Sequence, residues 1–304
     1  MEKISRVYNL FLRLFIKKSF PVWQRMGFHI TPNHFYEPVP DTRTLKDELW
    51  SKHSDMVGIE INKEAQINLL SEFRSKFKHE YDNFPKERTT IPHQYFVNNG
   101  TFESVDGETY YCMIRYFKPR RIIEVGTGYS TYLAAQAIVK NKEEYGIDCE
   151  FIAIDPYPNK TIEKGFPGLS KVIKSKVEDI DLSIFLELKE NDILFIDSSH
   201  ILKIGNDVHY LYLDVLPRLN KYVLIHIHDI FLPANYPRDW VLKEYRFWNE
   251  EYLLQAFLSF NNAFEVVLVA SYLHRKHPDE LRRTFSSYDP QKVGPGSFWM
   301  RRKI

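Results

Sequence analysis

A strand-like run that ends in a Gly-X-Gly turn constrains this chain more than any other segment. Residues 120–131 read Arg-Arg-Ile-Ile-Glu-Val-Gly-Thr-Gly-Tyr-Ser-Thr, and an Ala-rich amphipathic run over 132–140 follows at once. A strand, a glycine turn and a helix in this order leave backbone N–H groups open at a helix N-terminus, where no side chain shields them. The segment therefore predicts one unit of an α/β fold, with a ligand pocket at the turn or, as the alternative, a tight connection without ligand.

The acidic residues around this turn distinguish between two kinds of cofactor. Dinucleotide fingerprints need a third glycine, and Thr131 stands at that position. Glu124 ends the strand with a negative charge, which would repel a diphosphate but suits the ammonium group of a methionine moiety. Asp155 ends the next strand-like run, 149–155, where an acid can accept hydrogen bonds from ribose hydroxyls. The two acids together favour S-adenosylmethionine.

The segments downstream repeat the alternation of strand and helix. Strands are expected over 171–176, 191–197 and 222–229, with a helix over 208–219. Continuous apolar runs that end in an acid are typical of buried parallel strands, whose carboxyl ends form the ligand-binding edge of such a sheet. Two more strands, over 264–269 and 297–301, are expected to form an antiparallel pair. The pattern predicts an α/β fold with a doubly wound, Rossmann-like, mostly parallel sheet and a terminal antiparallel strand.

Several motifs are similar to those of a known family. They are Glu124-Val-Gly-Thr-Gly-Tyr-Ser-Thr, Phe195-Ile-Asp-Ser-Ser-His200, Leu216-Pro-Arg-Leu, His226-Ile-His-Asp-Ile-Phe-Leu-Pro233 and the run over 248–257. The chain resembles a bacterial group of class I S-adenosylmethionine-dependent methyltransferases related to small-molecule and sugar O-methyltransferases. The resemblance implies a cofactor site in which the turn holds the methionine part, Asp155 the ribose, and Glu178 or Asp179 the adenine. The predicted cofactor residues are Glu124, Gly126, Thr127, Gly128, Ser130, Asp155, Glu178, Asp179 and Asp197.

Methyl transfer to an oxygen needs positioning and a way to remove a proton. A histidine can accept that proton near neutral pH, and the catalytic candidates are His228, which lies closer to the expected rim, His200 and Asp197. Alternatively, a divalent cation such as magnesium, held by Asp197, His228 and Asp229, would lower the pKa of the hydroxyl. Ser199 stands where related sequences often carry a second acid, so this metal set departs from the family pattern. In a third interpretation, His200 and Asp229 only orient a loop.

Composition limits the partners. The 41 Lys and Arg residues balance 40 Asp and Glu residues, so no net field attracts nucleic acid. No apolar run reaches the roughly 20 residues that span a bilayer, so stable membrane insertion is not expected. The only two cysteines, Cys112 and Cys149, form no metal-type cluster, and a reduced, cytoplasmic protein is the default expectation. The expected partner is a small-molecule acceptor.

The N-terminal part differs from the rest. Residues 1–90 are predicted to form a helical and extended appendage, a lid or an interface, ahead of a methyltransferase domain over 91–304. A helix over 1–26 carries basic residues and an apolar stripe, and a second helix is expected over 64–81. The first helix is expected to dock on the domain, to form a contact in a homo-oligomer, or to touch anionic lipid. Its stripe consists of Ile4, Val7, Tyr8, Phe11, Leu12 and Phe15.

The expected function is S-adenosylmethionine-dependent methylation of an oxygen on a small polyol, sugar or glycan precursor. One alternative is an NAD(P)-dependent oxidoreductase, although the third glycine is absent and Tyr-X-X-X-Lys occurs only late, at 272–276 and 288–292. The other is a non-catalytic S-adenosylmethionine-binding subunit that scaffolds a biosynthetic complex.

Overall fold

The structure, a computed structural model, describes residues 2–304 and the side chains from Leu14 onward. The chain divides into two compact units. The smaller comprises Met1–Ser51 and Arg238–Phe247, and the larger comprises Lys52–Pro237 and Trp248–Ile304. The domain boundary predicted near residue 90 stays a prediction.

The smaller unit consists of one long helix, shorter helical segments and extended chain. Its elements are α1 (Glu2–Arg25), the 3-10 turn η1 (Thr42–Thr44), α2 (Glu48–Ser51) and α9 (Arg238–Leu242). Arg238 Nε donates to Asp47 Oδ1 (3.1 Å) and so joins the two chain segments. The predicted N-terminal helix is present as α1. Of its apolar stripe, Ile4 to Leu12 lie outside the described side chains, and Phe15 is exposed. Among the described residues, no helix combines the length and the apolar character needed to cross a bilayer.

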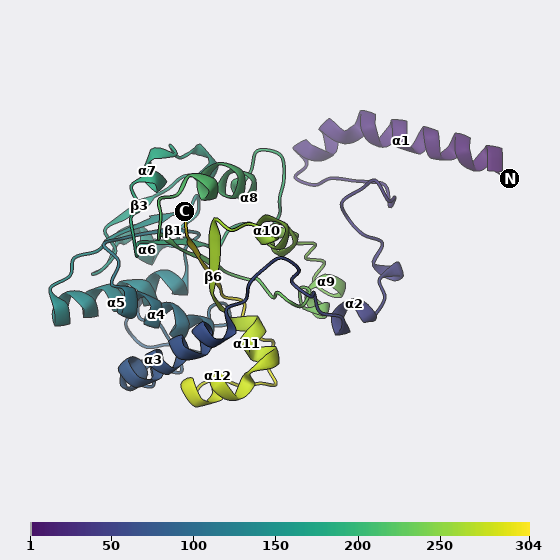
Figure 1. The fold of residues 1–304 in the computed structure, drawn as a ribbon. Coiled ribbons are helices and arrows are strands. Elements are labelled where there is room, and N and C mark those ends of the chain that lie inside the picture. Colours follow the sequence, from purple (N-terminus) through teal and green to yellow (C-terminus); the bar gives the residue numbers. More distant parts are fainter. Residues whose placement is uncertain (1) are drawn as a thin grey trace. The chain divides into compact units, whose positions relative to one another are not determined.

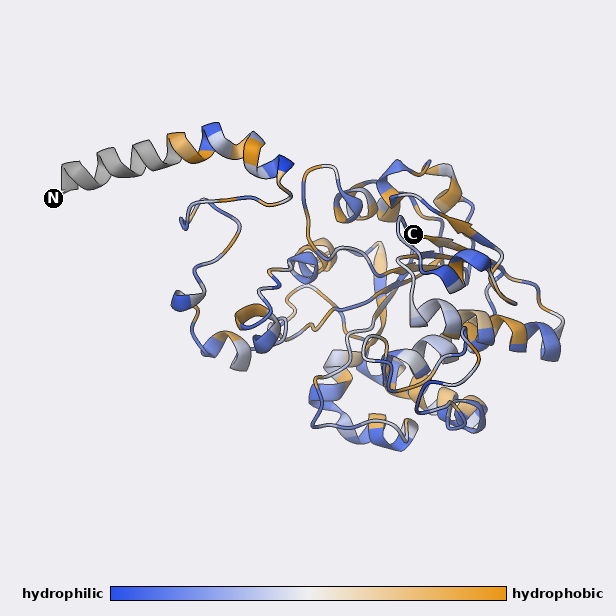
Figure 2. Cartoon of the chain, turned by 180° about the vertical axis from the view of Figure 1, so that it is seen from behind, coloured by the Kyte–Doolittle hydropathy of each residue, from blue (hydrophilic) through white to orange (hydrophobic). Residues whose placement is uncertain are grey.

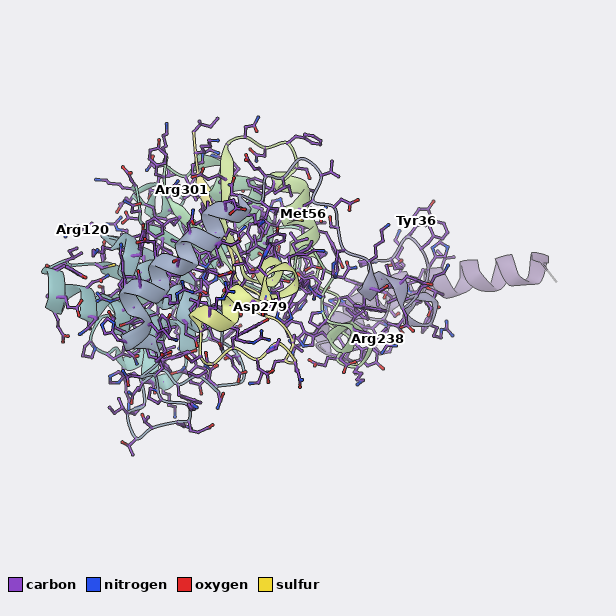
Figure 3. All side chains as sticks on the ribbon, turned by 60° about the horizontal axis from the view of Figure 1, so that its bottom comes forward. Tyr36, Met56, Arg120, Arg238, Asp279 and Arg301 are labelled. Carbon is purple, nitrogen blue, oxygen red and sulfur yellow. The ribbon has the colours of Figure 1, made fainter. Side chains whose placement is uncertain are left out.

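The larger unit is built around a seven-stranded sheet with the order β3-β2-β1-β4-β5-β7-β6 (Figure 1). Only β7 runs antiparallel to its neighbours, β5 and β6. Arg301 Nε of β7, whose position is labelled in Figure 3, donates to Glu265 Oε1 of β6 at 2.6 Å. The predicted fold class is therefore confirmed. The strands are β1 (Arg121–Val125), β2 (Glu150–Ile154), β3 (Lys171–Ile173), β4 (Ile193–Ile196), β5 (Leu224–Ile227), β6 (Phe264–Val269) and β7 (Phe298–Arg302).

Helices cover both faces of this sheet (Figure 1). Successive strand residues point to opposite faces, so Ile122 packs into one core and Ile123 into the other. The first core receives side chains from α3, α4, α5, α11 and α12, and the second from α7, α8 and α10. The helices are α3 (Lys63–Tyr81), α4 (Asp106–Phe117), α5 (Tyr129–Tyr145), α6 (Lys160–Lys164), α7 (Ser183–Leu186), α8 (Asp207–Tyr210), α10 (Glu250–Leu258), α11 (Ala270–Lys276) and α12 (Pro278–Thr284), with the 3-10 turn η2 (Val177–Asp179).

The helix expected over 208–219 is less regular than its apolar pattern predicts. It begins as α8, continues as a π-helical turn, η3 (Leu211–Val215), and ends as a 3-10 turn, η4 (Leu216–Arg218). Pro217 lies in this last turn, where a proline is tolerated but cannot donate a backbone hydrogen bond. The third strand is also shorter than predicted, because the chain leaves the sheet after Ile173.

Candidate active site

The turn between β1 and α5 passes close to the end of β4. Gly126 adopts φ +85°, and a Cβ atom there would lie 2.1 Å from the backbone oxygen of Asp197. Only glycine fits both the conformation and the space. The N–H of Gly126 donates to the carbonyl of Ile154 (2.9 Å), and the N–H of Asp197 donates to the carbonyl of Val125 (2.9 Å). These bonds fix the carboxyl ends of β1, β2 and β4 against one another.

Asp155 holds the same turn from the end of β2. Its Oδ2 accepts hydrogen bonds from the backbone N–H (3.0 Å) and the hydroxyl (2.5 Å) of Thr127. Its Oδ1 accepts from the N–H of Tyr157 at 2.7 Å. A carboxylate oxygen can accept more than one hydrogen bond, so the partly exposed Asp155 can still meet a ribose hydroxyl. That role stays a prediction.

A cavity of about 540 Å³ opens at these strand ends, within the size range of small-molecule sites. Five of the predicted cofactor residues line it, namely Gly126, Thr127, Asp155, Glu178 and Asp197. Lys176, Lys203 and Asp207 also line it, and the sequence patterns had not marked them. The carboxylate of Asp207 accepts hydrogen bonds from the N–H and the hydroxyl of Ser199 (both 2.7 Å).

The other predicted cofactor residues, Glu124, Gly128, Ser130 and Asp179, do not line this cavity. Glu124 is fully buried and accepts hydrogen bonds from the hydroxyls of Ser130 (2.7 Å) and Thr131 (2.9 Å). Its Oε2 has no hydrogen-bond partner among the described residues. Burial raises the pKa of Glu124 to about 8. Thr131, which replaces the third glycine, thus connects the buried acid to the start of α5.

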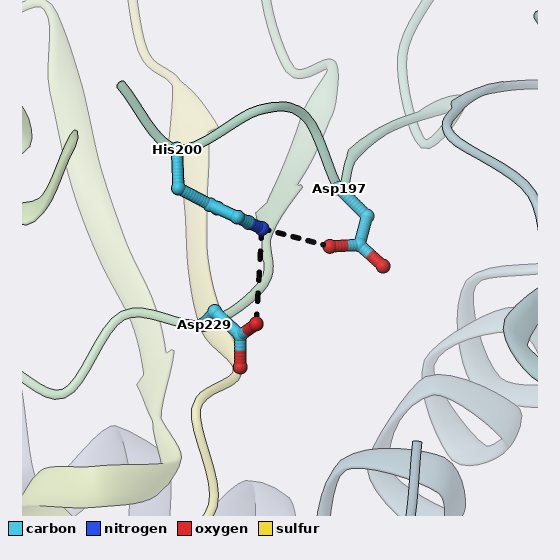
Figure 4. Close-up of side chains that lie close together, drawn as sticks. All are labelled: Asp197, His200 and Asp229. Carbon is cyan, nitrogen blue, oxygen red and sulfur yellow. Dashed lines mark ion pairs between the residues drawn. The ribbon is translucent and has the colours of Figure 1, made fainter. Parts of the chain in front are cut away.

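A group of polar side chains adjoins the cavity on the loops after β4 and β5. Asp197, His200 and Asp229 can each direct one ligand atom to a common point, with these atoms within 4.8 Å of one another (Figure 4). His200 Nε2 lies 3.3 Å from Asp197 Oδ1 and 3.7 Å from Asp229 Oδ2. We call these three residues the rim cluster. The predicted metal ligands are Asp197, His228 and Asp229, whereas the rim cluster contains His200 in place of His228.

The backbone at the rim cluster is strained. His200 has φ +59° and Asp229 has φ +55°, and both residues therefore adopt the left-handed conformation that glycine tolerates best. Such conformations cost about 1–3 kcal/mol and are concentrated at functional sites. Both side chains meet in the rim cluster, beside Asp197 of the cavity wall.

We refer to His200 and its neighbour His228 as the rim histidines, and a buried carboxylate lies beside one ring nitrogen of each. His200 Nδ1 lies 2.8 Å from Oε2 of Glu250, which is fully buried on α10. His228 Nε2 lies 3.5 Å from Oδ2 of Asp106, the first residue of α4, and His228 Nδ1 lies 3.5 Å from Asp197 Oδ1. Neither Glu250 nor Asp106 is marked as a site residue by the sequence patterns. The available signal was a pair of acids, Glu250 and Glu251, inside an otherwise apolar helical pattern.

Comparisons with known proteins identify the family. A family model described as a methyltransferase domain matches residues 123–230, from β1 to the loop after β5. An uncharacterized protein of Archaeoglobus fulgidus is 31% identical over 175 residues, which cover 55% of this chain and 77% of that protein. The sheet order and the antiparallel β7 match the same family's fold. The chain belongs to the class I S-adenosylmethionine-dependent methyltransferases.

Two solved structures resemble the methyltransferase more distantly. One is a methyltransferase of Podospora anserina bound to S-adenosylhomocysteine (17% identity, covering 79% of this chain and 88% of that one, TM-score 0.38). The other is an O-methyltransferase from Bacillus cereus in complex with the same compound (12% identity, 78% and 91%, TM-score 0.36). The family assignment makes the chain an enzyme with S-adenosylmethionine as its methyl donor. The oxidoreductase and scaffold alternatives gain no support from these comparisons.

The methyltransferase holds both rim histidines in their charged form. Burial alone would lower the pKa of His200, but hydrogen bonds to Asp197 and Glu250 outweigh burial and raise it to about 10. Burial also opposes the charged form of His228, yet the charges of Asp229 and Asp197 and the hydrogen bond to Asp106 raise its pKa well above the ordinary value. A histidine that is already protonated at neutral pH donates hydrogen bonds and cannot accept a proton.

His226, two residues before His228, plays a structural part. It is fully buried in β5, its Nε2 lies 2.8 Å from the hydroxyl of Ser297, and its ring stacks on Trp299. Burial lowers its pKa well below the ordinary value, so His226 is neutral and away from the chemistry.

Proposed function

We propose that this methyltransferase binds S-adenosylmethionine in the cavity beside Gly126 and methylates an oxygen of a small polyol, sugar or glycan precursor. The observation that carries the proposal is the double position of Asp197, which lines the cavity and also belongs to the rim cluster. In-line methyl transfer needs the acceptor atom roughly 3 Å from the methyl group. Because Asp197 belongs to both the cavity and the rim cluster, an acceptor bound at the cluster would lie next to a cofactor bound in the cavity.

The rim cluster and the neighbouring His228 supply groups that suit a hydroxyl acceptor. Charged His200 and His228 donate hydrogen bonds and stabilise negative charge on the reacting oxygen. Burial raises the pKa of Asp229, which makes this carboxylate a better proton acceptor than Asp197, whose pKa the two histidines lower. In this mechanism His228 supplies positive charge and Asp229 accepts the proton, a change from the base role expected for His228.

The rim cluster also fits a divalent cation. Two carboxylates and an imidazole form a donor set that suits manganese or zinc, and carboxylates suit magnesium. A cation held by Asp197, His200 and Asp229 would lower the pKa of the acceptor hydroxyl. To bind such a cation, His200 would have to lose the proton on Nε2. Glu250, which contacts Nδ1, would keep the ring oriented.

The first test of the proposal is calorimetric titration of the protein with S-adenosylhomocysteine, with NAD(H) as the control ligand. We expect the nucleoside to bind and NAD(H) not to bind. Asp155→Ala should abolish this binding, because it removes the carboxylate that holds Thr127. Asp181→Ala removes an exposed carboxylate outside the cavity and serves as the matched control. Equal binding by both variants would exclude Asp155 from the cofactor site.

The acceptor is then sought by methyl transfer to polyols, sugars and glycan precursors, with and without magnesium or manganese. If a chelator abolishes turnover, the result favours a cation at the rim cluster. If turnover survives chelation, the result favours Asp229 as the acceptor of the hydroxyl proton. Methylation of amines alone would contradict the oxygen acceptor. We place the reaction in the cytoplasm, in keeping with two unpaired cysteines, of which Cys112 is buried.

A further inference from the structure

The end of α1 and the chain that follows expose many large apolar side chains. Figure 2 shows apolar and polar segments interleaved along the coloured part of α1. The same stretch, residues 14–30, contains Lys17, Lys18 and Arg25, all exposed, and no acidic residue. Isolated exposed apolar residues are ordinary, but a contiguous set marks an interaction surface. The exposed apolar residues are Leu14, Phe15, Phe20, Val22, Met26, Phe28 and Ile30.

Local contacts give this surface a defined shape. Gly27 takes φ +86° and ends the helix, so that the chain turns back on itself. Phe28 then packs near Trp23 with ring centroids 5.5 Å apart, and His29 stacks on Phe20 at 4.8 Å. The indole N–H of Trp23 donates to the hydroxyl of Ser19 (2.8 Å). The helix end therefore carries an aromatic cluster that its own contacts organise.

Charge selects the partner for this surface. The 24 residues of α1 contain six basic residues and one acidic residue. The rest of the chain has 35 basic against 39 acidic residues, since the whole chain has 41 and 40. The positive charge of the chain is therefore concentrated in α1, whose described part also exposes several large apolar side chains. An apolar face bordered by Lys and Arg is complementary to an anionic bilayer surface, where apolar groups enter the acyl boundary and cations meet the headgroups.

We propose that residues 2–30 bind the surface of an anionic phospholipid bilayer, with α1 lying in the plane of the interface. The inference goes beyond the methyl-transfer chemistry and makes the methyltransferase a peripheral membrane enzyme. Lys17, Lys18 and Arg25 extend their charged ends to lipid phosphates, and the aromatic cluster around Trp23 anchors the helix end.

The test is co-sedimentation of the full-length protein with vesicles of phosphatidylcholine alone or mixed with phosphatidylglycerol. We expect the protein to pellet with the mixed vesicles and to remain in the supernatant with phosphatidylcholine, and added salt should weaken the binding. Each lysine near an anionic surface contributes about 1 kcal/mol, which is roughly a fivefold change in affinity. The double variant Lys17→Gln/Lys18→Gln should therefore bind about thirtyfold more weakly. Lys160→Gln/Lys164→Gln, the same charge change on exposed lysines of α6, should bind like wild type.

A second pair of variants tests the apolar face. Leu14→Ser/Val22→Ser should lose most vesicle binding, whereas Leu213→Ser/Val293→Ser, at similarly exposed positions elsewhere, should retain it. Binding of S-adenosylhomocysteine by all four double variants would show that the larger unit is folded. Equal binding to both kinds of vesicle, or to neither, overturns the proposal. Concentration-dependent self-association that Leu14→Ser/Val22→Ser abolishes, without vesicle binding, assigns the surface to a second copy of the chain instead.

Discussion

Single residues decide whether the turn after β1 can form. Gly126→Ala should destabilise the protein by about 1–3 kcal/mol, because alanine at φ +85° is strained and its Cβ would collide with Asp197. Gly128 is extended and has open space at its Cβ position. Gly128→Ala should therefore cost less than about 1 kcal/mol. Thermal unfolding of the two variants without ligand measures the difference. Equal losses would show that the contact with Asp197 does not restrict this position.

Glu124 gives the stability of the protein a pH dependence. Its pKa is about 8 in the folded protein, against 4.5 for the unperturbed group, so the folded state keeps a proton that the unfolded chain has already lost. The stabilisation that the protonated Glu124 contributes is fully present below pH 4.5, its pKa in the unfolded chain, and is lost as the pH rises through its folded pKa of about 8. Each unit of difference between the two pKa values corresponds to about 1.4 kcal/mol. Glu124→Gln should remove most of this fall.

Chemical unfolding at about pH 5 and about pH 8 measures the effect of Glu124. Glu143→Gln, at an exposed position on α5, is the control and should keep the dependence of the wild type. An unchanged slope in Glu124→Gln would mean that Glu124 is ionised in the folded protein, with a partner that neutralises its charge.

At the scale of elements, α10 presents two adjacent buried acids to different parts of the larger unit. Glu250 contacts His200, while the carboxylate of Glu251 accepts hydrogen bonds from the N–H groups of Phe231 (3.3 Å) and Tyr236 (3.0 Å). Glu250→Gln should lower the pKa of His200 and, when an acceptor is known, reduce turnover by about 10–100-fold. Glu251→Gln should leave the pKa of His200 unchanged. NMR titration of the His200 ring measures this pKa in both variants, and an unaltered value in Glu250→Gln would make the contact purely structural.

The loops after β4 and β5 make any cation site sensitive to pH. A cation and a proton compete for Nε2 of His200, whose pKa is about 10, so manganese affinity should rise with pH by about tenfold per unit through the neutral range. Calorimetric titration with manganese at several pH values measures the slope. His200→Ala should bind weakly, with the slope removed. A slope near zero in the wild type would exclude His200 as a ligand.

The sheet and its rim could be predicted from the sequence because parallel strands are continuous apolar runs that end in charge. Asp197 and Asp229 follow β4 and β5 for that reason, and the hydrogen-bonded register places both at one edge. The partners of the rim histidines could not be predicted. Glu250 is separated from His200 by 50 residues, and Asp106 belongs to a helix that precedes the first strand. Neither contact joins residues that are close in sequence, so no helical or strand periodicity indicates it. Only tertiary packing brings these groups together.

At the scale of the whole molecule, α3, which the predicted N-terminal appendage includes, belongs to the larger compact unit. Leu70, Phe73 and Phe77 of α3 are buried in the core that also contains α4 and α5. A chain of residues 52–304 should therefore fold and bind S-adenosylhomocysteine. A chain of residues 91–304 should not, because loss of three large core side chains at about 2–5 kcal/mol each approaches the total stability of a domain. Circular dichroism and calorimetry of both chains test this, and a folded, binding-competent 91–304 would place the domain boundary near residue 90.

The position of β7 also affects how the enzyme is made. The last strand of the chain lies between β5 and β6, so β6 has no neighbour in the sheet until residues 298–302 arrive. The two residues just before β7, Gly296 and Ser297, donate their N–H groups to Asp106 (2.9 and 2.8 Å), the acid that contacts His228. Because residues 296–302 follow β5 and β6 along the chain, a nascent chain that has not yet reached them lacks both the complete sheet and a supported His228. The sheet and the support of the active site are therefore completed together, by the same short segment.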